Sequence, residues 1–475
     1  MSKIRVHAAH CHTVDLKTRM PFKYGIATMT AFPLCFVEID CEIDGRSAPG
    51  IASDLLPPKW FKKDPQQEPA SELHELRSVI HHACALSLNR EAPSIYACWK
   101  QVYDEQAMWG RAQGLPPLLI HFGSSLIERA LIDALCRHLQ IPFHEALKNN
   151  RFGIRFEDLN PDLKQETTTA FIPQSPLDHV IARHTIGLSD PLTHVDIPDE
   201  ERLSDGLPQS LEECINTYGL KHFKVKICGD IKTDSERLTN ISKVLNANAP
   251  TDFAFSLDGN EQFVDPTAFK AFWEELNSHS SLKSLLKRLL FVEQPLHRDV
   301  ALNEDIGDVL HAWTDRPSII IDESDGDLNS ARKAIQLGYD GTSHKNCKGV
   351  FKSISNFLMI QKLNQDCPSR LLIQSGEDLC NQGPVSIMQD LCVAASLRIQ
   401  SVERNGHHYC AGLSAHPFSV QQDMLKHHPD VYAPTKKGWP SLAMDHGCIS
   451  MRSINASPFG IQCMPTLSDY ENVQS

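Results

Sequence analysis

The 475-residue sequence has few features of a membrane or exported protein. No apolar run approaches the roughly 20 residues that a helix needs to cross a bilayer. The N-terminal stretch MSKIRVHAAHCHTVDLKTRM also lacks the continuous apolar core of a signal peptide. We therefore expect a protein of the cytoplasm that makes no membrane contact.

Positive charge is scarce relative to negative charge. The chain has 46 Lys and Arg residues against 59 Asp and Glu residues, a formal net charge of −13. No segment gathers enough basic residues to neutralise a run of phosphates, so the sequence argues against a nucleic-acid partner.

Cysteine pairs in C-x-x-C spacing are absent, although the chain has 15 cysteines. The number is odd, and the cysteines are scattered from Cys11 to Cys463. This distribution is more typical of reduced thiols in a core than of disulfides or structural zinc.

The pattern of the chain changes near residue 179. Before it, alternating apolar residues predict an antiparallel β-meander, and helical apolar spacing follows. We assign residues 1–155 to an N-terminal α+β domain. We expect an insertion in it near residues 57–72, where the sequence reads PPKWFKKDPQQEPA. Residues 156–178, polar and proline-rich, are expected to form an inserted loop.

Residues 179–414 alternate strand and helix patterns, which predicts an α/β fold with a parallel sheet. Eight strands are the number that closes a TIM-type barrel. A dinucleotide-binding sheet is the weaker choice, because no Gly-rich phosphate loop follows a strand. The predicted strands are VIARHTIGLS, HFKVKIC, FAFSLDGN, LLFVEQP, SIIIDES, GTSHKN, RLLIQSG and RIQSVER.

Carboxylates follow three consecutive predicted strands at Asp258, Glu293 and Asp322. A single Asp at such a place often only caps the next helix. Three in succession, 35 and 29 residues apart, are about one strand-helix unit from each other, so a barrel brings them to neighbouring points on its rim. An oxygen-only set of ligands suits a hard cation, Mg²⁺ best, with Mn²⁺ as the alternative.

Lysines flank these carboxylates. Lys224 and Lys226 alternate along one strand and point the same way, and Lys345 follows the sixth strand, on the opposite side of a closed ring. An edge strand protected by lysines is the alternative explanation of Lys224 and Lys226. Inside a barrel, we expect the charge of Lys224 to lower the pKa of Lys226 and make it a base.

In this order, several motifs resemble the enolase superfamily, and within it the mandelate racemase and muconate lactonizing enzyme group. They span nearly the whole chain: RMPFKYGIATMT, ERALIDALCRHLQIPFHEAL, RHTIGLSDP, FKVKICG, LDGNEQF, FVEQPL, IDES and HKNCKGV. The resemblance implies a modified, enolase-like (β/α) barrel with the N-terminal domain as its cap. It also implies that residues 415–475 pack back on that capping domain.

The resemblance further implies a role for each matching residue. Lys226 and Lys345 are then the acid and base on the two faces of the substrate, assisted by Lys224, and Asp258, Glu293 and Asp322 hold Mg²⁺. Asn260 and Glu323 support the metal ligands. The loop around Arg19 to Tyr24 closes over the substrate, and Glu403 is a candidate substrate contact.

The sequence departs from one member activity at the eighth strand. Dipeptide epimerases carry an Asp-x-Asp there, whereas this chain reads Glu403-Arg404-Asn405, which puts that activity in doubt. His407 and His408 follow the same strand and can reach the cavity or bond to backbone as ordinary loop residues. Glu377 and Asp378, after the seventh strand, are equally well explained as helix caps.

The predicted function is therefore abstraction of a proton α to the carboxylate of a small substrate, giving an enediolate. Two lysines on opposite faces permit a racemase, an epimerase or a cycloisomerase. The alternatives are a dehydratase that acts by β-elimination on an acid sugar or related hydroxy acid, and a metal-binding barrel without turnover. The resemblance also implies a homo-oligomer.

Overall fold

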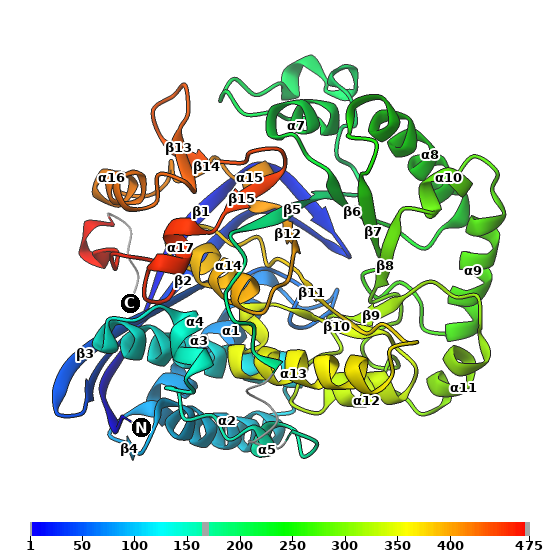
Figure 1. The fold of residues 1–475 in the computed structure, drawn as a ribbon. Coiled ribbons are helices and arrows are strands. Elements are labelled where there is room, and N and C mark those ends of the chain that lie inside the picture. The colour runs from blue at the N-terminus through cyan, green and yellow to red at the C-terminus, as the bar shows by residue number, and fades with distance from the viewer. Residues whose placement is uncertain (1, 164–170, 471–475) are drawn as a thin grey trace.

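The N-terminal domain begins with an antiparallel sheet. The computed structural model describes residues 2–163 and 171–470, and Figure 1 shows its fold. The sheet has the strand order β3-β2-β1-β4, with β1 Ile4–Tyr24, β2 Ala27–Ile43, β3 Arg46–Leu55 and β4 Glu91–Ala92. Gly45 has a φ of +80° in the tight turn between β2 and β3, a conformation that glycine adopts without strain.

Helices pack on this sheet in two tiers. The sheet is contacted by α1 Pro69–Ser87 and α3 Pro117–Leu139, whereas α2 Ile95–Ala112 and α4 Phe143–Lys148 pack mainly on other helices. Helix α3 is buried around almost its whole circumference between the sheet, its neighbouring helices and the barrel. A side chain at Gly50 of β3 would place its Cβ 2.1 Å from the carbonyl oxygen of Ala130 in α3, so glycine permits this close packing.

Eight parallel strands close into a barrel, which confirms the predicted fold class. The last strand pairs with the first, with Val402 opposite Ala182. The strands are β5 His179–Ile186, β6 His222–Lys226, β7 Ala254–Asp258, β8 Leu289–Glu293, β9 Ile319–Ile321, β10 Gly341–His344, β11 Ile373–Gly376 and β12 Ser401–Arg404. Seven lie within the segments predicted from the sequence, and β5 begins one residue before its predicted segment.

Helices surround the barrel on its outside (Figure 1). Apolar residues of the strands and of these helices form the core between the two layers. The helices are α7 Leu211–Tyr218, α8 Ile231–Asn248, α9 Pro266–Ser278, α10 Lys283–Leu286, α11 Asp305–Ala312, α12 Ser330–Gln336, α13 Val350–Asp366, α14 Ser386–Ser396 and α15 Gly406–Tyr409.

The C-terminal segment contacts both domains. Its strand β15 pairs antiparallel with β5 of the barrel, and the guanidinium of Arg137 in α3 donates to the carbonyl oxygens of Ile461 and Gln462. The segment contains α16 Phe418–His427, β13 Tyr432–Pro434, β14 Pro440–Leu442, β15 Cys448–Ser450 and α17 Arg452–Ala456.

Two further sequence-based expectations concern loops. The stretch from Arg19 to Tyr24, expected as a loop, is the end of strand β1, with an irregularity in its pairing to β2 between Lys17 and Phe22. In the inserted loop predicted at 156–178, helix α5 spans Phe156–Leu159, and residues 164–170 lie outside the described residues. Within the described chain, no helix is both long and apolar enough to cross a membrane.

Candidate active site

A cavity lies where the capping domain meets the C-terminal ends of the barrel strands. Its two sides differ in chemistry. The barrel contributes mainly polar groups: Lys224, Lys226, Asp258, Asn260, Asp322, Lys345, Asp378, Glu403 and Asn405. The capping domain and the loop after β11 contribute mainly apolar groups: Phe22, Tyr24, Met29, Pro57, Trp60, Leu379 and Cys380.

Strand β6 aims two lysines into this cavity. Phe223 and Val225 alternate with them and pack in the outer core, so Lys224 and Lys226 both point to the barrel interior. This arrangement excludes an edge-strand explanation, because β6 is hydrogen-bonded on both sides, to β5 and β7.

Lys224 is surrounded by carboxylates. Its Nζ lies 3.0 Å from Asp258 Oδ2, 2.7 Å from Glu293 Oε2, 2.8 Å from Glu377 Oε2 and 2.9 Å from Glu403 Oε2. Burial alone lowers the pKa of Lys224, but these carboxylates outweigh burial and hold its pKa well above the ordinary value. Lys224 is therefore an ammonium that neutralises a ring of acids.

Lys226 and Lys345 occupy opposite sides of the cavity, because β6 and β10 are separated by three strands in either direction around the ring. Lys226 Nζ donates to Asp258 Oδ2 at 2.5 Å, and Lys345 Nζ donates to Asp322 Oδ2 at 2.6 Å. Burial lowers the pKa of Lys345, but the carboxylate of Asp322 more than compensates, so its pKa is raised.

The three carboxylates predicted to bind metal end strands β7 and β8 and follow β9. All are buried, and Glu293 Oε2 has no hydrogen-bond donor but lies 2.7 Å from the ammonium of Lys224. The oxygen-only donor set fits Mg²⁺. In this structure, however, each carboxylate is ion-paired with lysine: Asp258 with Lys224 and Lys226, Glu293 with Lys224, and Asp322 with Lys345 and Lys348.

The charges of these carboxylates depend on the lysines. Burial raises the pKa of Asp322, but Lys345 and Lys348 outweigh it and hold that pKa well below the ordinary value. At Asp258, the positive charges of Lys224 and Lys226 likewise outweigh the effect of burial, so the pKa of Asp258 is lowered. At Glu293, burial and the neighbouring Asp258 raise the pKa. The site thus favours an additional positive charge near Glu293.

Asn260 and Glu323 lie beside these carboxylates. The backbone N–H of Asn260 donates to Asp258 Oδ1 at 2.8 Å, and its side-chain amide donates to Glu323 Oε1 at 3.4 Å. Burial, together with the charge of Asp322, raises the pKa of Glu323 to about 7. Both residues are placed to orient their neighbours.

The sequence matches no family model and no curated protein. Solved structures, in contrast, match along almost the whole chain. An N-succinyl Arg/Lys racemase from Bacillus cereus is 15% identical over 99% of each chain, with a TM-score of 0.58. The 2-chloromuconate cycloisomerase from Rhodococcus opacus is 15% identical over 94% of each chain, with a TM-score of 0.59.

A third match is an enolase from Bradyrhizobium complexed with magnesium and mandelic acid. It is 13% identical and covers 95% of this chain and 94% of that chain, with a TM-score of 0.55. This chain has the enolase-superfamily fold. The resemblance seen in the sequence motifs is confirmed at the level of the fold, and at these identities the likeness shows the fold alone.

Within this enolase-type fold, the three predicted substrate contacts lie in different settings. Tyr24 and Glu403 line the cavity. Glu403 also accepts hydrogen bonds from Thr185 and Lys224. Arg19 is not among the lining residues; its guanidinium pairs with Asp205 at 2.6 Å and donates to the His408 carbonyl oxygen at 2.9 Å.

Three residues that the sequence did not single out line the cavity or pair with the buried acids beside it. Lys348 lies in the short 3₁₀ turn after Lys345 and donates a hydrogen bond to Asp322. Because the two lysines are three residues apart in this turn, both side chains reach the same carboxylate. Arg183, on the first barrel strand β5, forms an ion pair with Glu377. Trp60, in the insertion near 57–72, covers Lys345; only its large apolar ring in a polar loop could have marked it.

Proposed function

We propose that this protein is a divalent-metal-dependent enzyme that removes a proton from the carbon next to a substrate carboxylate and returns a proton to it. The reaction is an isomerisation, either racemisation or epimerisation, or a cycloisomerisation. The observation that carries this proposal is the placement of Lys226 and Lys345, which line one cavity from opposite sides of the barrel. One lysine can accept a proton on one face of the carbon while the other donates on the opposite face.

A proton next to a carboxylate is weakly acidic, so its removal requires a base and stabilisation of the developing negative charge. Asp258, Glu293 and Asp322 would hold a Mg²⁺ ion, which would supply that stabilisation. Lys345 is placed to deliver the proton, because Asp322 favours its ammonium form. Lys226 is then the base, and the two roles exchange for the opposite stereoisomer.

The substrate is a small carboxylate with an apolar remainder. The polar wall of the cavity suits the carboxylate and its reacting carbon, whereas Phe22, Met29, Trp60 and Leu379 offer no partner for a second charged group. The Bradyrhizobium structure contains magnesium and mandelic acid, an example of such a ligand. Assembly into a homo-oligomer stays a prediction.

Proton exchange tests this proposal without knowledge of the product. The protein with Mg²⁺ is incubated in D₂O with separate stereoisomers of N-acylated amino acids, aryl hydroxy acids, cycloalkene acids and acid sugars. We expect deuterium at the α-carbon of at least one acid. Lys226→Ala is expected to abolish exchange from one stereoisomer and Lys345→Ala from the other, whereas the surface variant Lys270→Ala exchanges normally. Absence of exchange in the whole panel contradicts the proposal.

A further inference from the structure

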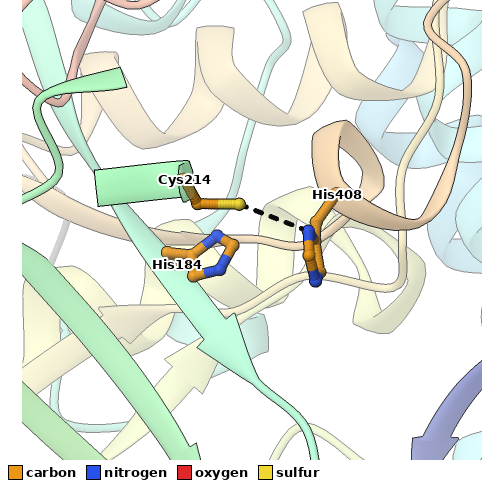
Figure 2. A group of neighbouring side chains, drawn as sticks. All are labelled: His184, Cys214 and His408. Carbon is orange, nitrogen blue, oxygen red and sulfur yellow. Dashed lines mark hydrogen bonds between the residues drawn. The ribbon is translucent and has the colours of Figure 1, made fainter. Parts of the chain in front are cut away.

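A buried cluster of two histidines and a cysteine lies at the seam where the barrel closes. His184 comes from β5, Cys214 from α7 and His408 from α15 (Figure 2). One ligand atom from each lies within 4.8 Å of the others, and Cys214 Sγ is 3.5 Å from His408 Nδ1. None of the three lines the candidate active site, and all are at most 2% exposed.

The spacing of this cluster suits a metal ion bound by nitrogen and sulfur. Zinc lies about 2.0–2.1 Å from histidine nitrogen and about 2.3 Å from cysteine sulfur, in tetrahedral geometry. Ligand atoms around such an ion are therefore about 3.3–3.8 Å apart. The distance between Cys214 Sγ and His408 Nδ1 already falls in this range. The three side chains are therefore compact enough to share one ion.

Neighbouring side chains orient the two imidazoles as metal ligands require. His184 Nδ1 is hydrogen-bonded to His407 Nε2 at 3.0 Å, so its Nε2 is available to an ion. His408 Nε2 lies 3.8 Å from Asp190 Oδ2, which leaves Nδ1, the atom nearest Cys214, for the same ion. An imidazole that binds metal through one nitrogen typically directs the other at a carboxylate or another acceptor.

Asp190 is itself fixed in place. Its Oδ2 accepts hydrogen bonds from the hydroxyl of Tyr409 at 2.5 Å and from the backbone N–H of Gly187 at 2.7 Å. Together with a thiolate at Cys214, its carboxylate would balance the two positive charges of a divalent ion. Without an ion, the interior holds polar groups with poor partners: Cys214 and His408 are joined only by a weak sulfur contact, and His407 Nδ1 makes no hydrogen bond.

We propose that His184, Cys214 and His408 bind one Zn²⁺ ion, with a water molecule as the fourth ligand. On binding, the Cys214 thiol releases its proton to solvent, and the thiolate forms the bond to zinc. The ion joins β5, α7 and α15, and Arg19 of the capping domain hydrogen-bonds to the carbonyl oxygen of His408. Bound zinc would stabilise the closure of the barrel beside strand β1 of the capping domain.

Cobalt titration tests the site, because a thiolate bound to Co²⁺ gives a charge-transfer band that oxygen ligands do not. The full chain is stripped with a chelator and titrated with Co²⁺ in excess Mg²⁺. We expect one equivalent to produce the band, Zn²⁺ to remove it, and Zn²⁺ to raise the thermal unfolding midpoint. Cys214→Ser is expected to lose the band, whereas Cys392→Ser, a buried cysteine in α14, retains it.

Absence of a thiolate band in the wild-type protein overturns the proposal, and so does a band that persists in Cys214→Ser. If Cys214→Ser does not fold, X-ray absorption at the zinc edge of the wild-type protein decides. One sulfur neighbour with nitrogen neighbours supports the site, and a shell of oxygen and nitrogen alone overturns it. None of these measurements depends on turnover, so the outcome is independent of the proposed enzymatic activity.

Discussion

The ammonium of Lys345 lies 4.4 Å from the centroid of the Trp60 ring. A cation at this distance from an indole face is stabilised electrostatically, which favours the charged form of the lysine. Trp60 lies in the segment between β3 and α1, whereas Lys345 follows β10, so the capping domain contacts one of the two lysines that we propose act on substrate. This segment therefore forms part of the cavity wall.

Replacing Trp60 by Leu is expected to weaken substrate binding. The change removes the contact with Lys345 and part of the apolar wall, and a loss of about 1–2 kcal/mol corresponds to a roughly tenfold increase in KM. The measurement is the rate of α-proton exchange against substrate concentration. Trp109→Leu, in α2 and away from the cavity, is the control. An unchanged KM in Trp60→Leu contradicts a role for the ring in binding.

A second prediction concerns Arg298, which holds the loop that carries Trp60. Its guanidinium donates to the carbonyl oxygens of Trp60 and Phe61, both at 2.9 Å, and forms two hydrogen bonds of 2.7 Å with Glu261. In Arg298→Gln, the loop loses these charged donors and opens more often. Hydrogen bonds to charged groups contribute roughly 1.5–3 kcal/mol, so we expect trypsin to cleave near Lys62 at least about tenfold faster.

The matched control for the loop is Arg316→Gln. Arg316 also pairs with a carboxylate, Asp340, and donates to two carbonyl oxygens, but it precedes β9 at the opposite, N-terminal end of the barrel strands. Its loss is expected to leave the cleavage rate near Lys62 unchanged. Equal acceleration in both variants would show general destabilisation rather than release of the loop.

The barrel could be predicted because most of its strands have an apolar run bounded by polar residues at the rim. The same logic gave the positions of Asp258, Glu293 and Asp322, which follow directly from strand order. Positions without a regular apolar pattern could not be predicted in the same way. Trp60 is in an irregular loop, and the stretch from Arg19 to Tyr24 was expected to be a loop but extends a hairpin.

Contacts between distant parts of the chain also could not be predicted from the sequence. Glu377 looked equally like a helix cap, because only barrel closure brings Lys224 and Arg183 against it. Cys214 and His408 are 194 residues apart and share no local spacing that marks metal ligands. The carboxylates around Lys224 likewise come from separate strands and meet only when the barrel closes.

A third prediction follows from those carboxylates. Lys224→Met leaves four buried acids without their shared cation, which is expected to reduce the free energy of unfolding by about 3–5 kcal/mol in the presence of EDTA. If Asp258 and Glu293 also bind metal, Mg²⁺ replaces part of the lost charge. Added Mg²⁺ should then raise the unfolding midpoint more in Lys224→Met than in the wild-type protein.

Lys352→Met provides the control for this metal effect. Lys352 is also buried and paired, with its Nζ 3.1 Å from Asp325 Oδ1, but it does not line the cavity. We expect a comparable loss of stability without any additional response to Mg²⁺. A similar response to Mg²⁺ in the two variants would contradict metal binding beside Lys224. Denaturant titrations at several Mg²⁺ concentrations measure the difference.

A fourth prediction concerns pH and Glu128, which lies in α3 of the capping domain. Its carboxylate accepts backbone hydrogen bonds from Val350 at 3.0 Å and Phe351 at 2.6 Å, at the start of α13 in the barrel. Burial raises the pKa of Glu128 from 4.5 to about 7, although these hydrogen bonds oppose the shift. The folded state therefore binds this proton more tightly than the unfolded state does.

The contribution of Glu128 to stability is consequently greatest below its unfolded pKa of 4.5 and decreases as the pH rises to its folded pKa of about 7. The full change is on the order of 3 kcal/mol. Because Gln carries no titrating group, Glu128→Gln should lack this decrease. Between pH 5 and pH 8, the unfolding free energy of Glu128→Gln should thus rise relative to that of the wild-type protein.

The control is Glu145→Gln, at an exposed glutamate of α4, which should follow the wild-type curve. Parallel curves for Glu128→Gln and the wild-type protein would show that the carboxylate is already charged at pH 5, held so by the N-terminus of α13.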